Sequence, residues 1–131
     1  MNAAFNSLPW HDAELMELLV DRRNAGERDE VRLRVVWPQG YEASLVFRDC
    51  YAMTADMYFG IIAAERIGSA SIIKDDPGLT SIRERWKPLG VSLESLCCYR
   101  IRMSSTGSTI RIYATQFEVE RLGDRGRDAH Y

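Results

Sequence analysis

The residues best suited to chemistry in this chain are His11, Asp12 and Glu14, which stand close together in the sequence. Imidazole and carboxylate groups can share a divalent metal ion or act together as an acid–base pair. The only other histidine is His130, near the C-terminal end, so few further metal ligands are available. A metal-binding or small-molecule-binding function centred on these residues is therefore an alternative function for the chain. The simpler interpretation is that Asp12 or His11 forms a hydrogen bond to backbone where the first element begins.

The three cysteines are Cys50, Cys97 and Cys98. An odd number with two adjacent residues is not a disulfide framework, and no Cys or His spacing suits zinc. On a strand, Cys97 would share a face with Tyr99, and Cys98 would share the other face with Arg100, whose guanidinium favours a reactive thiolate. Since the cysteines form no disulfide framework, we expect reduced thiols in a cytoplasmic protein. Because no partner histidine stands nearby, we expect no catalytic role for these thiols.

Arginines alternate with apolar residues in two predicted strands, at Arg32, Arg34, Arg100 and Arg102. A basic sheet face with aromatic side chains is one way to hold single-stranded nucleic acid. However, Tyr99 has the opposite parity to the arginines of its strand, and acidic residues such as Glu42 are interleaved. A cross-strand Arg–Glu ladder is the simpler explanation. The formal net charge of -2 provides no general attraction to nucleic acid, so we do not expect nucleic-acid binding.

Several sequence motifs of enzymes do not occur. The chain has no glycine-rich phosphate loop, no nucleophile elbow and no His-Glu-x-x-His pair, and the hydroxyl-rich stretch 104–109 is typical of a hairpin loop. No apolar run approaches the ~20 residues of a membrane span, and residues 1–9 lack the pattern of a secretory signal. We therefore expect a non-enzymatic protein without a cofactor, which binds a protein partner and does not cross a membrane.

Alternation of apolar and polar side chains predicts two hairpins. The first joins the runs 31–35 and 41–47 around the turn 38–40. The second joins 97–103 to a long strand beginning at Ile110, around a loop that contains Gly107. Residues 12–23 are ambiguous, because their composition suits a helix and their alternation also fits a strand.

The middle of the chain is less regular. We predict an irregular or single-turn helical link over 50–59, and extended chain over 59–63 and 67–74. Asp76 and Pro77 then suit the start of a helix. Its predicted apolar face carries Leu79, Ile82, Trp86 and Leu89, which recur at helical spacing.

These elements predict one α+β domain over the 131 residues. The expected architecture is a mainly antiparallel sheet of about six or seven strands, built from hairpins, with one principal helix at 77–89 packed on a face. The segments 1–9 and 123–131 are expected to be flexible ends.

The stretch Leu8-Pro9-Trp10-His11-Asp12-Ala13-Glu14-Leu15 is followed by two strand-like runs. It resembles small uncharacterised bacterial proteins that open with a His-Asp-Ala element, some of which are similar to immunity proteins of polymorphic toxin systems. The resemblance covers mainly the first fifty residues. It implies that 14–22 is a strand continuing into a β-meander, and that the chain binds a protein partner; it implies no catalytic residues. A homodimer through an exposed sheet edge is an open alternative.

Overall fold

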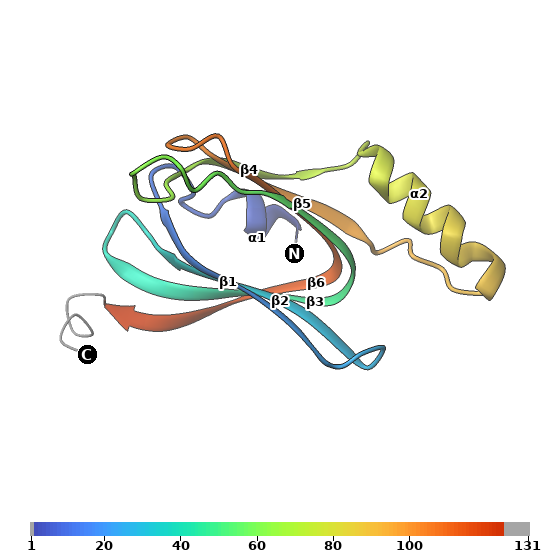
Figure 1. Ribbon diagram of the computed structural model, residues 1–131. Coiled ribbons are helices and arrows are strands. Elements are labelled where there is room, and N and C mark those ends of the chain that lie inside the picture. Colours follow the sequence, from blue (N-terminus) through green and yellow to red (C-terminus); the bar gives the residue numbers. More distant parts are fainter. Residues whose placement is uncertain (1, 125–131) are drawn as a thin grey trace.

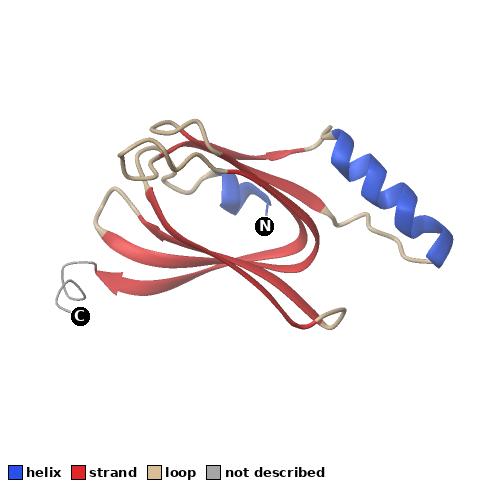
Figure 2. Ribbon diagram, viewed as in Figure 1, coloured by secondary structure: helices blue, strands red, loops and turns tan. Residues whose placement is uncertain are grey.

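The computed structural model describes residues 2–124, which form one six-stranded antiparallel sheet with a short helix within its curl and a longer helix on its outer face (Figures 1 and 2). The elements are α1 (Asn2–Asn6), β1 (Glu14–Asn24), β2 (Arg28–Val36), β3 (Tyr41–Asp56), β4 (Ile67–Ile73), α2 (Pro77–Trp86), a 3₁₀ turn (Lys87–Leu89), β5 (Cys97–Met103) and β6 (Thr109–Asp124). Across the sheet the strands follow the order β1-β2-β3-β6-β5-β4. The predicted fold class, a mainly antiparallel α+β sheet with six or seven strands, is confirmed.

Strand β1 resolves the ambiguity at 12–23. Leu15 lies opposite Val35 and Leu18 lies opposite Leu33, so the apolar side chains of β1 and β2 reach the same core. The helix propensity of this segment is a weak preference that strand pairing overrides. Extended chain is also what the resemblance implies for 14–22. The hairpin that follows, around the turn at 38–40, is confirmed.

Strand β3 departs from the predicted elements. It reaches Asp56, so the irregular or helical link predicted over 50–59 is wrong up to that residue, and the predicted extended chain at 59–63 is instead part of a loop. A β-bulge between Cys50 and Ala52 follows Asp49, whose φ of 54° is left-handed. The extra residue of a bulge interrupts the alternation of a strand without ending its pairing, which explains why the sequence pattern was lost here.

The sheet curls so that its two edge strands meet at one end only. Backbone hydrogen bonds join Asp12 N to Ile67 O (2.9 Å), Ile67 N to Ala13 O (2.7 Å) and Leu15 N to Glu65 O (2.8 Å). Beyond these contacts the two edges diverge, and α1 lies within the curl (Figure 1). The inner face of the sheet is therefore covered by the chain's own N-terminal segment.

Phe5 of α1 fills the centre of that core. It has no solvent exposure, and its ring centroid lies 4.8 to 6.3 Å from those of Trp10, Phe47, Tyr99 and Phe117. Burial of Phe5 thus packs α1 against the sheet, and the flexibility expected for 1–9 stays a prediction. Of the flexible end expected at 123–131, only 123–124 lies within the described residues, where β6 ends.

Helix α2 begins as predicted and packs on the outer face of the sheet. Asp76 caps it by accepting a hydrogen bond from Gly78 N (2.9 Å). Leu79 and Ile82 are buried in a second cluster with side chains of β5, β6 and the loop before β5. The helix gives way to the 3₁₀ turn after Trp86, so the apolar face ends early: Trp86 is half-buried and Leu89 is 70% exposed. None of the helices in the described part of the chain is long and apolar enough to cross a membrane.

Candidate interaction surface

The loop between β3 and β4 exposes a cluster of large apolar side chains. Phe59 is 83% exposed and Ile62 is 103% exposed, while Tyr58 and Ile61 are 54% and 47% exposed. We call residues 58–62 the apolar loop. Full burial of one such side chain is worth about 1.5–3 kcal/mol, so the isolated protein forgoes considerable stabilisation here. Clusters of this kind are typical of surfaces that bind a partner.

Hydroxyl groups of the β5–β6 turn hold both ends of the loop between β3 and β4, which contains the apolar loop. Ser108 Oγ accepts a hydrogen bond from Tyr58 N (3.0 Å). Ser105 Oγ accepts from Arg66 N (2.9 Å) and donates to Ala64 O (2.6 Å). The apolar side chains are therefore presented by a loop whose ends are fixed.

A buried polar cluster supports these contacts. Thr106 donates a hydrogen bond to the carboxylate of Glu65, and the hydroxyls of Thr106 and Ser108 are 2.9 Å apart. Ser108 has no solvent exposure. The stretch 104–109 is thus the hairpin loop that the sequence predicted, and it also clamps a neighbouring loop, which the sequence did not indicate.

The open edge of β1 begins next to the loop between β3 and β4. After the hydrogen bond between Leu15 and Glu65, the rest of β1 pairs only with β2 among the described strands. Met16, Leu19 and Val20 on this edge are 43%, 54% and 49% exposed. The β1 edge consequently begins beside Glu65 of the β3–β4 loop, outside the apolar loop at 58–62.

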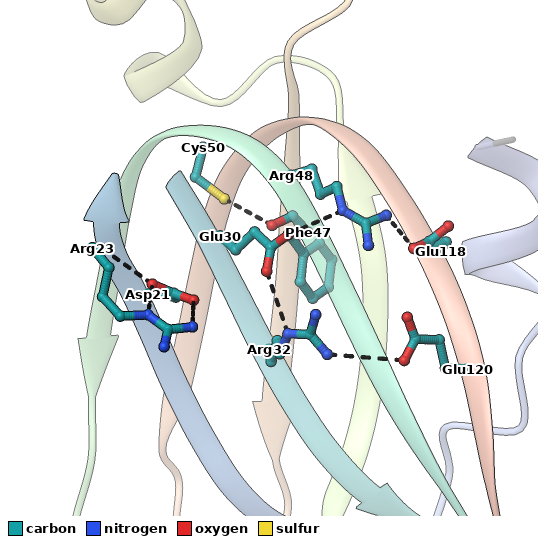
Figure 3. A network of polar contacts seen from close by, with 9 residues as sticks. All are labelled: Asp21, Arg23, Glu30, Arg32, Phe47, Arg48, Cys50, Glu118 and Glu120. Carbon is teal, nitrogen blue, oxygen red and sulfur yellow. Dashed lines mark hydrogen bonds and ion pairs between the residues drawn. The ribbon is translucent and has the colours of Figure 1, made fainter. Parts of the chain in front are cut away.

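Arg32 lies in a ladder of ion pairs on the outer face of the sheet (Figure 3). The carboxylate of Glu30 accepts hydrogen bonds from Arg32 (3.3 Å) and from Arg48 (3.1 Å). Arg48 also pairs with Glu118, and Arg32 Nη1 lies 3.8 Å from Glu120. The cross-strand Arg–Glu ladder expected from the sequence is confirmed for these strands.

Arg34 continues the ladder, and the two arginines of β5 do not. Arg34 lies between Glu42, at 2.6 Å, and Glu17, at 3.4 Å. Arg100 and Arg102 belong to β5, which is separated from β2 by β3 and β6. The four arginines predicted as one candidate surface are therefore divided between two parts of the sheet, and the two on β2 have carboxylate partners.

The ladder reaches the edge strand at Asp21 and Arg23. Arg23 donates to Asp21 through Nε (3.1 Å) and Nη2 (2.8 Å) (Figure 3). These hydrogen bonds, more than the charge alone, lower the pKa of Asp21 from 3.8 to about 2. Asp21 is buried and Arg23 is exposed, so the guanidinium is the outermost charge at this point of the edge.

The structure brings together only part of the predicted polar cluster. His11 Nε2 lies 3.6 Å from Asp12 Oδ2, and both side chains are exposed, at 80% and 54%. Glu14 instead lies 3.7 Å from Arg66. Within residues 2–124, no group of three or more His, Cys, Asp or Glu side chains is placed to hold a metal ion. Asp12 N donates to Ile67 O, so this turn has a structural task in joining the sheet edges.

Cys98 lies in the opposite environment to the one predicted. We expected it on a wet face beside Arg100; it is fully buried beneath α2, next to Tyr113. Burial first, and then the charge of Asp76, raises the pKa of the Cys98 thiol to about 11. The thiolate that reactivity requires is therefore disfavoured.

A groove of about 600 Å³ lies at the end of the molecule away from the apolar loop, between the β1–β2 turn and the last residue of α2. Its walls include Val20, Cys50, Met53 and Trp86. Burial raises the pKa of the Cys50 thiol to about 12. The one thiol among the lining residues is thus kept protonated, and the groove offers no activated nucleophile there.

Comparison with known proteins gives no family assignment: no protein-family model and no curated protein matches the chain. A functional proposal for this protein therefore rests on its own residues. Among the large apolar side chains of residues 2–124, Phe59 and Ile62 of the apolar loop are the most exposed.

Proposed function

We propose that this protein is a non-enzymatic protein-interaction module that binds a protein partner through the apolar loop at 58–62. The exposure of Phe59 and Ile62 carries this proposal, because it is combined with fixed loop ends. A loop held by the hydroxyls of Ser105 and Ser108 loses little conformational freedom on binding, which reduces the cost of association. Large rigid apolar side chains on such a loop suit the buried centre of an interface.

The charges around the loop favour a protein partner over a lipid surface. No Lys or Arg occurs between Asp49 and Glu65, whereas anionic membranes attract basic segments. The flanking carboxylates of Asp56 and Glu65 instead suit the polar rim of a protein interface around an apolar centre.

The resemblance to immunity proteins narrows the proposal to a toxin domain as the partner, in a bacterial cell. We place this function in the cytoplasm, because Cys50, Cys97 and Cys98 are all free thiols, as expected in a reducing compartment. A toxin-like gene beside the gene for this chain, with a product that co-purifies with it, would support this narrower form. A neighbouring product that does not co-purify would count against it.

The test is affinity capture from the source cells with three purified proteins. The first is the natural chain and the second carries Phe59→Ser and Ile62→Ser. The third carries Leu89→Ser, which removes an exposed apolar side chain of the 3₁₀ turn, away from the loop. Thermal melts check that the three proteins are equally folded, as expected for exposed substitutions.

We expect the natural chain and the Leu89→Ser control to capture the same protein, and the loop variant to lose it. Equal capture by the natural chain and the loop variant would refute the role of the apolar loop. Flotation with anionic lipid vesicles is run in parallel. Vesicle binding that depends on Phe59 and Ile62 would refute the choice of a protein as partner.

A further inference from the structure

The open edge of β1 has a charge pattern that is complementary to itself. Its regular part lies between two irregularities in the pairing with β2, one between Leu15 and Glu17 and one between Asp21 and Asn24. Within residues 2–124, no second strand pairs with this regular part on its outer side, so its backbone N–H and C=O groups are offered to a further strand. Glu17, with an exposure of 66%, stands near one end of this segment, and Arg23, at 82%, stands near the other.

When an edge strand pairs with a second copy of itself, a two-fold axis passes through one residue that faces its own counterpart. With Val20 on the axis, Glu17 of each copy lies opposite Arg23 of the other, giving two pairs of opposite charge. With Leu19 on the axis, Glu17 would lie opposite Asp21, giving two pairs of like charge. With Asp21 on the axis, two Asp21 carboxylates would face each other. Since like charges directly opposite destabilise a strand pair, Val20 is favoured among these three registers.

We infer that two copies of this chain pair in antiparallel fashion through their β1 edges, with Val20 on the two-fold axis. This surface is separate from the apolar loop that carries the proposed function. It gives the homodimer that the sequence left as an open alternative a defined strand and register.

The side-chain faces fit this register. Glu17 lies opposite Arg34 of β2, and Asp21 lies opposite Glu30, so both project to the outer face that carries the ion-pair ladder. Arg23 reaches the same face, where it contacts Asp21. The pairing therefore extends the ladder of Figure 3 from one copy into the next.

The apolar residues of the edge gain contacts in the same arrangement. Val20, half exposed in one copy, meets Val20 of the second copy at the axis. Because the paired segment is short, the interface is smaller than the standard of about 1,600 Å². We therefore expect a dimer that dissociates on dilution in the micromolar range.

Sedimentation of the full chain over a dilution series tests the charges. Glu17→Arg and Arg23→Glu should each weaken the dimer about tenfold, because each replaces two opposite-charge pairs by two like-charge pairs. The double variant restores both pairs with reversed signs and should dimerise within about twofold of the natural chain. A natural chain that stays monomeric at every concentration, or a double variant as weak as the singles, would overturn the inference.

Cysteine substitution tests the register without changing charge. With Val20→Cys, the two introduced thiols are opposite each other, with Cα atoms about 4.5–5.5 Å apart, and the oxidant diamide should join them in a disulfide. The matched control Leu19→Cys has a similar exposure, but its two copies would be diagonal neighbours at about 7–8 Å, beyond the reach of a disulfide. Covalent dimers of Val20→Cys alone are expected. Preferential crosslinking of Leu19→Cys, or crosslinking of neither variant, would contradict the register. Neither variant alters the apolar loop, so these results are independent of the partner-capture experiment.

Discussion

Replacing Phe5 by alanine should destabilise the protein more than any loop substitution. Phe5 is fully buried, and its ring is surrounded by those of Trp10, Phe47, Tyr99 and Phe117. Truncating a buried phenylalanine costs about 3–5 kcal/mol, because it removes apolar contact and leaves a cavity. For a domain of this size, 1 kcal/mol lowers the melting temperature by about 3–5 °C. We therefore expect a loss of about 10–20 °C.

The assay is thermal unfolding followed by circular dichroism, with Phe59→Ala as the matched control. The control makes the same chemical change at a side chain that is 83% exposed, so its free energy of unfolding should change by about 0.5 kcal/mol or less. If Phe5→Ala melts within a few degrees of the natural chain, α1 does not fill the curl of the sheet. If Phe59→Ala is as destabilising as Phe5→Ala, the apolar loop is part of the core and not a binding surface.

Three further predictions concern groups around α2 and the edge strand. Gly78→Ala should lower the free energy of unfolding by about 1–3 kcal/mol in a denaturant melt, because its Cβ would press on the Tyr113 hydroxyl and lie 2.8 Å from Tyr113 Cζ. Adding Tyr113→Phe should recover part of this loss, and strictly additive losses in the double variant would contradict the contact. The Cys98 thiol, with its pKa raised from 9.0 to about 11, should react with a thiol reagent only on unfolding, and rapid labelling of the folded protein would refute its burial. The contribution of this thiol to stability should be fully present below pH 9 and lost as the pH rises toward 11. Asp21, with its pKa lowered from 3.8 to about 2, should stabilise the fold above pH 3.8 and lose that contribution as the pH falls through 2. In an NMR titration, Arg23→Ala should move the titration midpoint of the Asp21 carboxyl back toward 3.8, and an unchanged midpoint would contradict the assigned cause.

The hairpins and the start of α2 were predictable because their signals are local. Period-two alternation in β2 and β5, the turn at 38–40 and the cap at Asp76 all act within a few residues. The second half of β3 was not predictable in this way. Its bulge disrupts the alternation, and only the pairing with β6, more than fifty positions later, holds it in the sheet. Phe5 was missed for a similar reason, since one aromatic residue in a polar segment has no periodicity to place it.

The candidate site was hidden from the sequence for a different reason. An apolar run such as 58–62 normally indicates a strand, and nothing local shows that its side chains are exposed. The clamp that fixes the loop joins residues 41 positions apart, as in the contact of Ser105 with Ala64. The ladder containing Arg32 and Arg34 could be anticipated because its partners alternate on neighbouring strands. The surroundings of Cys98 could not, because α2 covers part of a face that the arginines of β5 had marked as polar.

Photocrosslinking at position 59 tests the central claim most directly. Phe59 is replaced by benzoylphenylalanine in the source cells, and the same substitution at Leu89 serves as the control, since that side chain is also exposed but lies on the 3₁₀ turn. Binding through the apolar loop predicts one defined protein adduct from position 59 and none of that mass from position 89. No adduct from position 59, or the same adducts from both positions, would contradict it.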